Sequence, residues 1–359
     1  MDFDRLIEKC IESGDLDKDE TAFLLSQEDE ERVSRIIAAA DEVRNRFCGD
    51  EVHIRALIEF SNYCRNDCLY CGLRKSNREV QRYRMTPDEI VDTAISIAKK
   101  GIGTVVLQSG EDMSFTGEII ADIIRRIKAA ADVAITLSLG ERIYEDYALW
   151  KEAGADRYLL RHETANPELF AKIHPDSTLE NRLGCLLELK RLGYQIGAGS
   201  MVGIPGQTID DMALDIILLK DLEVDMAGIG PFIPHPNTPF GEAEQGSLDM
   251  TLKMVALARI VTRDALIPAT TATGTVDEFG REKALMAGAN VVMPNHTPLT
   301  YRVNYEIYPN KRCITEDPEM CGPCLTARIL SIGRKVATGK GHSPKFIRKM
   351  QEQKDTASV

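Results

Sequence analysis

Apolar residues follow two alternating periods along this chain. Eight short runs rich in aliphatic and β-branched residues are typical of buried strands, and stretches with apolar positions three and four residues apart are typical of helices. The predicted strands are residues 52–60, 104–108, 133–139, 157–160, 195–202, 226–232, 266–271 and 290–293, and helices between them include 86–100, 117–130, 179–192, 208–222 and 248–262. This alternation predicts the α/β class with a parallel sheet.

Capping and turn residues support the predicted helices. Thr86 precedes Pro87, and Glu89 follows three positions after the threonine, which is a capping box with proline at the first helical position. Glycines follow several apolar-periodic segments and can adopt the left-handed conformation that ends a helix. They are Gly101, Gly154, Gly193 and Gly288.

Eight strands with intervening helices predict a (βα)8 TIM barrel over residues 51–300, with an open doubly wound sheet as the alternative. Residues 1–50 are predicted to be a helical N-terminal extension, and residues 301–359 a C-terminal segment that bears cysteines. The active site of such a barrel lies at the carboxyl ends of its strands, so we expect the chemistry in the loops that follow them.

Charge and composition indicate which classes of partner and which cellular compartment are to be expected. The 359 residues carry a formal net charge of −12, which argues against a nucleic acid or an anionic membrane surface as partner. The chain has no apolar run near the ~20 residues that span a bilayer, and its N-terminus lacks the basic and apolar regions of a signal peptide. We therefore expect a cytoplasmic protein with reduced thiols, and its nine cysteines cannot all pair.

Three cysteines follow the first predicted strand at the spacing CxxxCxxC. They are Cys64, Cys68 and Cys71. Three thiolates on one short loop repel one another and oxidise unless a metal binds them. Structural zinc needs four closed ligands, and no fourth cysteine or histidine follows nearby. A 4Fe-4S cluster held by three cysteines would leave one iron open for an exogenous ligand.

This loop, with the aromatic Tyr70 before its last cysteine, resembles the cluster-binding motif of the radical S-adenosylmethionine (SAM) superfamily. The resemblance implies that SAM binds the open iron through its amino and carboxylate groups. It also implies that the reduced cluster cleaves SAM to methionine and a 5′-deoxyadenosyl radical, while the protein positions the reactants and excludes water and oxygen.

Further segments resemble the SAM contacts of the superfamily, in the order expected. The turn after the second strand, Ser109-Gly110-Glu111, matches the site of the methionyl amino group, although many relatives have glycine at the first position. Residues 199–208, which include Met201, match the ribose and adenine contact. An ordinary βα turn is the simpler explanation for either segment alone.

Charged residues follow the fourth predicted strand, where a barrel presents its catalytic groups. Arg161 and Glu163 lie there, and a solvated loop that caps the next helix is the alternative explanation. Arg182, near the start of a later helix, is either a surface charge or a bidentate partner of the SAM carboxylate.

A closer resemblance, over roughly residues 50–325, is to the HydE-type maturases of FeFe hydrogenases. It rests on stretches such as FSNYCRNDCLYCGLRKSN, RYRMTPDEI, GADRYLLRHETANP and GIGPFIPHPNTP. By this resemblance Arg161, Glu163 and Arg182 contact SAM, and Tyr305 lies beside the cofactor. The residues that match the substrate cavity of the family are Gln108, Ser109, Thr136, Met226, Thr270, Thr271 and Met293. Packing inside the barrel is the alternative role for the two methionines.

The resemblance implies a radical SAM enzyme in the assembly of the diiron centre of the hydrogenase H-cluster. Its substrate would be a small organometallic unit, an iron carbonyl cyanide that carries cysteine, and the adenosyl radical would attack the cysteine sulfur. A tyrosine-cleaving radical SAM maturase would supply this unit, and a GTPase scaffold maturase would receive the product.

Three other functions stay open. A methylornithine synthase-like radical SAM mutase has a similar cluster loop. Biotin synthase-like sulfur insertion needs a second cluster inside the barrel, but the other seven predicted strands carry no cysteine. A non-catalytic carrier of iron–sulfur units would lack SAM contacts such as Arg161 and Glu163.

A second cysteine triad, Cys313, Cys321 and Cys324, lies near the C-terminus. Pro318 and Pro323 interrupt this segment, which predicts a loop. Three more thiols suggest a second 2Fe-2S or 4Fe-4S cluster, as some members of the family carry, and free thiols or an adventitious zinc site are the alternatives. The remaining cysteines, Cys10, Cys48 and Cys185, are expected to bind no metal.

Overall fold

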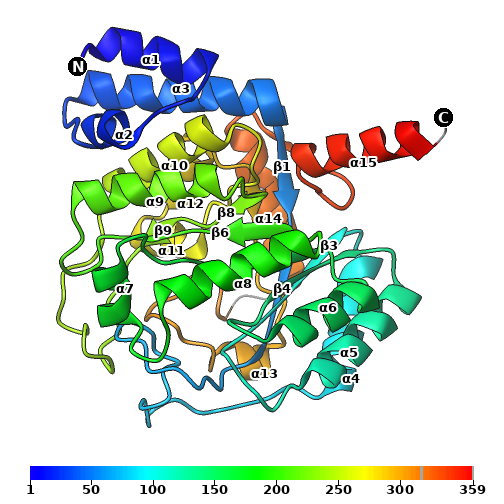
Figure 1. Cartoon of the computed structure of the whole chain (residues 1–359). Coiled ribbons are helices and arrows are strands. Elements are labelled where there is room, and N and C mark those ends of the chain that lie inside the picture. The colour runs from blue at the N-terminus through cyan, green and yellow to red at the C-terminus, as the bar shows by residue number, and fades with distance from the viewer. Residues whose placement is uncertain (316–317, 358–359) are drawn as a thin grey trace.

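Six parallel strands form the main sheet, in the order in which they occur along the chain (Figure 1). The structure, a computed structural model, describes residues 1–315 and 318–357, and their side chains except those of residues 318–321 and 356–357. The six strands are β2 (Ala56–Ser61), β3 (Thr104–Ser109), β4 (Ala134–Ser138), β5 (Arg157–Leu159), β6 (Gln195–Ala198) and β8 (Met226–Ala227). The predicted α/β class with a parallel sheet is therefore confirmed.

Shorter parallel pairings extend this arrangement. β1 (Glu51–Ile54) lies between β10 (Val291–Val292) and β11 (Lys335–Val336), and β7 (Met201–Val202) pairs with β9 (Gly230–Pro231). Single parallel bridges join Met226 to Leu266, Pro268 to Val291 and Leu57 to Asn295. Parallel pairing thus continues from β8 through residues 266–268 and β10 to β1 and β2.

Two of the predicted strands are broken where the backbone comes close to its neighbour. Gly199 follows β6 with a φ of 154°, and a Cβ atom there would lie 2.0 Å from the carbonyl oxygen of Gly228. Only glycine permits this approach, which separates β6 from β7 and β8 from β9. The predicted strand at 266–271 forms only single bridges, because Pro268 has no N–H to donate.

Helices cover the outside of the sheet in chain order, so that α4 contacts α5, α5 contacts α6 and α9 contacts α10. The helices that connect or follow the strands are α4 (Pro87–Lys99), α5 (Gly117–Ala130), α6 (Tyr144–Ala153), α7 (Pro167–Ile173), α8 (Leu179–Arg191), α9 (Ile209–Asp221), α10 (Leu248–Thr262), α11 (Thr271–Val276), α12 (Gly280–Met286) and α13 (Leu299–Arg302). The capping box at Thr86 and the left-handed glycines at 101, 154, 193 and 288 are confirmed.

Residues 1–50, predicted to be a helical extension, contain three helices that share the core of the sheet. They are α1 (Phe3–Glu12), α2 (Lys18–Leu25) and α3 (Glu30–Cys48), and they pack along α9 and α10 (Figure 1). Leu24, Ile36 and Ala40 are fully buried in the same cluster as Ile58 and Val105 of the sheet. Residues 1–48 therefore do not have a separate core.

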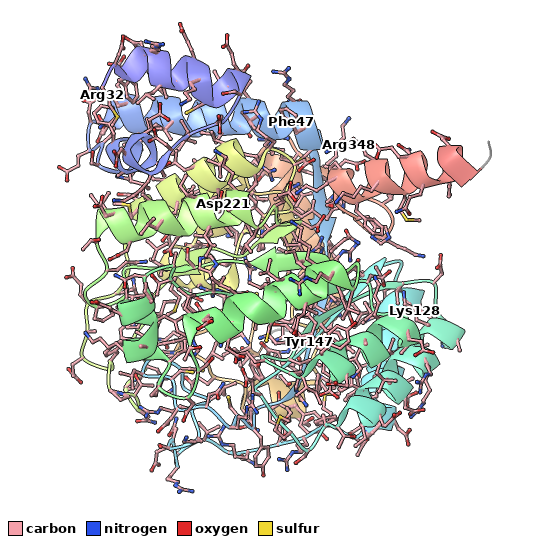
Figure 2. All side chains as sticks on the ribbon, viewed as in Figure 1. Arg32, Phe47, Lys128, Tyr147, Asp221 and Arg348 are labelled. Atoms are coloured by element: carbon pink, nitrogen blue, oxygen red, sulfur yellow. The ribbon has the colours of Figure 1, made fainter. Side chains whose placement is uncertain are left out.

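The interior is filled by large side chains from both layers. Tyr147 of α6 lies between its helix and the sheet (Figure 2), and its ring is 5.1 Å from that of Tyr158 at an edge-to-face angle of 77°. Trp150 stacks on Tyr158 with an interplanar angle of 6°. Close aromatic packing of this kind fixes α6 against β5 and leaves the carboxyl ends of the strands free to build a site.

The C-terminal segment returns to the amino ends of the strands. Residues 339–343, which we call the C-terminal plug, follow β11. Arg157 donates to the carbonyl oxygens of Lys340 and Gly341 at 2.6 and 2.9 Å. Thr104 donates to the carbonyl of Lys340 at 2.8 Å, and Arg55 to that of Gly341 at 3.2 Å. The plug therefore closes the end of the sheet opposite to the predicted site.

One helix, α14 (Pro318–Ser331), contradicts the prediction that the segment of the second cysteine triad is a loop. It contains both prolines, and α15 (Pro344–Ala357) projects from the body beside the plug (Figure 1). Pro318 is at the first helical position, where its missing N–H is not needed, and Pro323 removes a single internal hydrogen bond early in the helix. In the described part of the chain, no helix combines the length and the hydrophobicity that spanning a bilayer requires.

Candidate functional site

Asp67 organises the loop that follows β2, residues 62–83, which we call the cluster loop. Its carboxylate accepts hydrogen bonds from Arg74 Nε and Ser76 Oγ, each at 2.6 Å. The hydrogen bond from Arg74 is the largest cause of a lowered pKa at Asp67. The backbone N–H of Asp67 donates at 2.6 Å to the carboxylate of Asp176, which follows α7. The loop is therefore folded and docked by contacts of the protein itself.

Asn62 and Arg82 hold the two ends of the cluster loop. The Asn62 side chain accepts from the backbone N–H of Tyr83 at 2.7 Å and donates to the carbonyl of Asn304 at 2.7 Å. Arg82 donates to the carbonyl of Leu73 at 2.9 Å. These contacts satisfy backbone groups that a loop without regular structure would otherwise leave unpaired.

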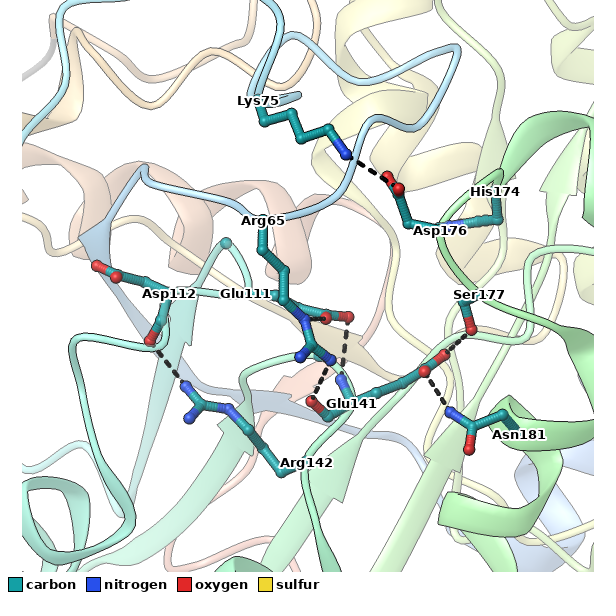
Figure 3. A network of polar contacts seen from close by, with 12 residues as sticks. Arg65, Lys75, Glu111, Asp112, Glu141, Arg142, His174, Asp176, Ser177 and Asn181 are labelled. Atoms are coloured by element: carbon teal, nitrogen blue, oxygen red, sulfur yellow. Dashed lines mark hydrogen bonds and ion pairs between the residues drawn. The ribbon is translucent and has the colours of Figure 1, made fainter.

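A polar network ties the cluster loop to the turns after β3 and β4 (Figure 3). Arg65 Nε is 2.9 Å from Glu111 Oε2, and the other oxygen of Glu111 accepts from the backbone N–H of Glu141 at 3.0 Å. The Glu141 carboxylate accepts from Ser177 at 2.7 Å and from Asn181 at 2.5 Å. Glu111, predicted to contact SAM, is thus already engaged in holding three loops together.

Gly110 explains the glycine turn after β3. A Cβ atom at this position would lie 2.2 Å from the carbonyl oxygen of Tyr63 and 2.9 Å from Cβ of Cys64. Only glycine allows the turn to pack this closely against the cluster loop. The neighbouring Ser109 donates its hydroxyl to the Gly110 carbonyl at 2.6 Å.

The three thiols of the cluster loop line one cavity. Burial, followed by the charge of Cys64, raises the pKa of Cys71 to about 12. Burial, followed by the charges of Cys71 and Cys64, also raises the pKa of Cys68. Three thiolates in this place therefore need a positive partner. Three thiols on one loop match the three-cysteine ligation of an iron–sulfur cluster with one open iron, whereas structural zinc needs a fourth protein ligand.

Arg161 and Glu163 form the opposite wall of this cavity. Their Nη2 and Oε2 atoms are 3.0 Å apart but are not aligned for a hydrogen bond. Both atoms, and Nε of Arg161, are buried without a hydrogen-bond partner. Buried polar groups of this kind are normally satisfied, so the pair fits a polar ligand such as SAM.

Arg182 is buried, which excludes the alternative of a surface charge. Its Nε is 2.5 Å from Glu141 Oε1, and Nη1 donates to the carbonyl of Arg161 at 2.8 Å. Its guanidinium also lies over the ring of Phe170 at 5.5 Å. The residue lines the cavity, and its contacts hold the Arg161 turn in place.

The cavity has a volume of about 330 Å³, within the range of small-molecule sites. It brings together most of the predicted residues: Cys64, Cys68, Cys71, Gln108, Ser109, Gly110, Glu111, Arg161, Glu163, Arg182, Met201, Thr270, Thr271 and Met293. Except for Arg182 of α8, they lie at or after the carboxyl ends of different strands, as expected for the active site of a barrel.

Three predicted residues are not part of the cavity wall. Thr136 is buried with its hydroxyl unpaired. Met226 is buried in a cluster with Leu266 and Val291. Tyr305 lies behind Gln108, whose side-chain amide donates to its hydroxyl at 3.3 Å. Side chains point alternately to the two faces of a strand, so the sequence alone did not show which of these residues would face the cavity.

The sequence analysis missed several residues of the cavity wall. Glu59 of β2 and Lys311 form a buried ion pair there, and Asn295 donates to Glu59 at 2.6 Å. Tyr308 and His174 also line the cavity. The sequence contains one sign of this ion pair, the glutamate within the apolar strand 56–61. Its partners, however, lie more than two hundred positions away in the chain.

The second triad is only partly described. Cys313 is half-buried with a φ of 61°, and its Sγ is 3.9 Å from Nη1 of Arg281. Cys324 is exposed on α14. The side chain of Cys321 lies outside the described residues. The expected bystanders Cys10 and Cys185 are buried, and Cys48 is half-buried.

Comparisons with known proteins agree with this geometry. The model of the radical SAM superfamily matches residues 58–219. The [FeFe] hydrogenase maturase subunit HydE of Thermotoga maritima is 58% identical over 296 residues, which cover 82% of this chain and 85% of that protein. The 3-methylornithine synthase of Methanosarcina acetivorans is 30% identical over 310 residues, with 85% and 87% covered. The crystal structure of methylornithine synthase (PylB) matches with a TM-score of 0.80 at 26% identity, over 92% of this chain and 97% of that chain.

Proposed function

Because the chain belongs to the radical SAM superfamily and, within it, to the family of the HydE hydrogenase maturases, we propose that Cys64, Cys68 and Cys71 hold its 4Fe-4S cluster. The chain is accordingly a radical SAM enzyme of the HydE type, which uses SAM and this cluster. The observation that carries the assignment is that three thiols of one loop line the same cavity as Arg161 and Glu163, which have buried polar atoms without a hydrogen-bond partner.

Each group of the cavity then has a distinct task. When bound, the cluster supplies the electron that cleaves SAM to methionine and a 5′-deoxyadenosyl radical. Arg161 and Glu163 offer a donor and an acceptor to the polar groups of SAM, and Arg182 holds the turn that carries them. Met201 provides an apolar contact, and the buried walls exclude water.

We further propose that Gln108, Thr270, Thr271 and Met293 face the substrate. The cavity offers an amide, two hydroxyls and a thioether at these positions, which suits a small, soft, organometallic molecule such as an iron-bound cysteine. A tyrosine-cleaving radical SAM maturase as supplier and a GTPase scaffold as recipient follow from the role of the family.

Closure of the sheet into a (βα)8 barrel is also part of the proposal. The bridges at Leu266, Pro268 and Asn295 support it, because they continue the parallel pairing to the first strand. Residues 51–300 would form this barrel, with residues 1–50 packed on its outside. Residues 301–359 would contribute to the cavity at one end, through Lys311, and to the C-terminal plug at the other.

Anaerobic conversion of SAM to 5′-deoxyadenosine tests the assignment. The reduced wild-type protein should form 5′-deoxyadenosine, and Cys68→Ala should lose this activity together with most of the iron of the first cluster. Cys324→Ala, which removes an exposed thiol, is the matched control and should retain the activity. Full turnover by Cys68→Ala would contradict the proposal.

The second triad needs its own measurement. We propose that Cys313, Cys321 and Cys324 bind a second 2Fe-2S or 4Fe-4S cluster that SAM cleavage does not require. Cys324→Ala should then contain fewer irons per chain than the wild type, by anaerobic iron analysis, with unchanged 5′-deoxyadenosine formation. An unchanged iron content would leave the triad as free thiols.

A radical SAM mutase is the second candidate, since methylornithine synthase (PylB) matches nearly the whole chain with a TM-score of 0.80. Both functions would form 5′-deoxyadenosine, but they differ in the other product of the reaction. Formation of 3-methylornithine would favour the mutase, whereas activation of an apo-hydrogenase together with the other maturases would favour the HydE-type function.

A further inference from the structure

His174 lies between α7 and α8, far from the cluster loop in sequence, yet its ring contacts two residues of that loop. Nδ1 of His174 is 3.2 Å from Sγ of Cys68, and Nε2 is 2.9 Å from the hydroxyl of Tyr70. The side chain is buried, and it lines the cavity together with Cys68 and Tyr70. The ring therefore bridges one proposed cluster ligand and the aromatic residue of the motif.

The position of this ring is fixed from several sides. Phe170 stacks on it, with ring centroids 4.9 Å apart and an interplanar angle of 16°. The backbone N–H of His174 donates to the carbonyl of Phe170 at 2.8 Å. Two residues later, Asp176 accepts from Lys75 at 2.9 Å, so the whole segment is docked on the cluster loop (Figure 3). The contact with Cys68 is thus built into the fold.

The chemistry of the two neighbours determines the direction of the hydrogen bonds. A metal-bound thiolate can only accept, so Nδ1 of His174 must carry a proton when Cys68 is a ligand. The Tyr70 hydroxyl can donate or accept, and it therefore satisfies Nε2 whichever form the ring takes. The hydrogen-bonding capacity of the triplet therefore matches a thiolate at Cys68.

We propose that His174 donates a hydrogen bond to the Cys68 thiolate of the bound cluster, with Tyr70 orienting the ring, and that this bond raises the reduction potential of the cluster. The inference rests on the proposed ligation of the cluster by Cys68. Hydrogen bonds to cluster sulfurs are one of the factors that set the potential, because they stabilise the more negative, reduced form. His174 is then a positioning residue, comparable to the outer-shell partners of other metal sites.

Three substitutions separate the hydrogen bond from packing. His174→Phe keeps an aromatic ring on Phe170 but removes the donor. His174→Gln keeps a side-chain N–H that can reach the thiolate. Tyr70→Phe keeps the ring of residue 70 and the donor at His174 but removes the hydroxyl that orients it.

The midpoint potential of the SAM-free cluster, followed by EPR during an anaerobic redox titration, is the main readout. We expect His174→Phe to shift it to a more negative value, Tyr70→Phe to shift it less in the same direction, and His174→Gln to remain close to the wild type. The iron–thiolate stretching frequencies in resonance Raman spectra should rise in His174→Phe, because the hydrogen bond weakens the iron–sulfur bond.

Two results would overturn the inference. One is an unchanged midpoint in His174→Phe with a complete cluster, and the other is an equal shift in His174→Phe and His174→Gln, which would indicate packing alone. If His174→Phe assembles no cluster, the comparison of Tyr70→Phe with the wild type decides by the same criterion. A wild-type protein without a 4Fe-4S signal would instead contradict the proposed function.

Discussion

Glu163 occupies a backbone conformation that few residues with a side chain adopt, with a φ of 65°. Its N–H donates to the carbonyl of Gly199 at 2.9 Å, and its own carbonyl accepts from Met201 at 3.0 Å. Behind it, the buried His162 accepts from the N–H of Gly199 at 3.2 Å and lies 3.6 Å from Asp215. These contacts hold a strained turn, and the strain lets Arg161 and Glu163 face the cavity together.

The buried pair of Arg182 and Glu141 offers a test at this scale. Glu141→Ala should lower the free energy of unfolding by about 3–5 kcal/mol, because it leaves the guanidinium of Arg182 buried without a counter-charge. Urea unfolding of the cluster-free protein measures this change. Glu145→Ala, an exposed glutamate on α6, is the control and should have little effect. A similar small effect of both substitutions would contradict the structural role of the pair.

At the scale of elements, the prediction of helix ends was more accurate than the prediction of loops. The capping box at Thr86 identified the start of α4, because it needs only residues three positions apart. The equivalent box at Thr208 of α9 was not predicted. The same local reasoning failed for α14, because the cost of a proline depends on where the helix begins.

The C-terminal plug should respond to pH through His342. Its Nδ1 accepts from Nη2 of Arg157 at 3.1 Å and from Nε2 of Gln195 at 2.8 Å, and these two nitrogens can only donate. Burial, followed by the charge of Arg157, lowers the pKa of His342 to about 4. The unfolded chain binds this proton near its ordinary value of about 6.5, so the histidine disfavours the folded state increasingly as the pH falls from about 6.5 to about 4.

Urea midpoints of the cluster-free protein at about pH 7.5 and about pH 5.5 test this expectation. The wild type should be less stable at the lower pH, and His342→Gln, which has no titrating ring, should show a smaller decrease. Equal pH dependence in the two proteins would show that other histidines with a lowered pKa, such as His53 and His296, account for the effect.

At the scale of the whole molecule, basic side chains in and just after α10 hydrogen-bond to the C-terminal ends of the N-terminal helices α1 and α2. Lys253 Nζ donates to the carbonyls of Leu25 and Gln27 at 2.5 and 2.9 Å, at the C-terminal end of α2. Arg263 donates to the carbonyls of Cys10 and Ile11, each at 2.7 Å, at the end of α1. Cationic side chains at helix C-termini satisfy the last carbonyls and the helix dipole.

Removing these two donors should loosen residues 1–48 without changing the cluster loop. Lys253→Ala and Arg263→Ala should each lower the free energy of unfolding by about 1–3 kcal/mol, because buried carbonyls lose their partners. Limited proteolysis of the double variant should cut first within the N-terminal helices. Lys18→Ala, which breaks the exposed ion pair with Asp210, is the control, with an expected change below about 1 kcal/mol. Unchanged protease resistance of the double variant would contradict this arrangement.

The parts of the site that could be predicted are those whose residues lie close together in the sequence. Cys64, Cys68 and Cys71 lie on one loop, and their spacing was sufficient to indicate a cluster. His174 and Lys311 approach that loop from other parts of the chain, and no periodicity or motif connects them to it. Distances of this kind depend on how the helices pack, which a single sequence does not reveal.

The order of the strands has a consequence for synthesis. β1, near residue 50, finds its two neighbours only at β10 and β11, near residues 290 and 335. The cluster loop likewise depends on Asn304 and Ile307, which emerge from the ribosome more than two hundred residues after it. A chain still being translated has the three cysteines but not the residues that hold their loop. We therefore expect iron insertion to follow release from the ribosome, so that nascent chains stay free of the cluster.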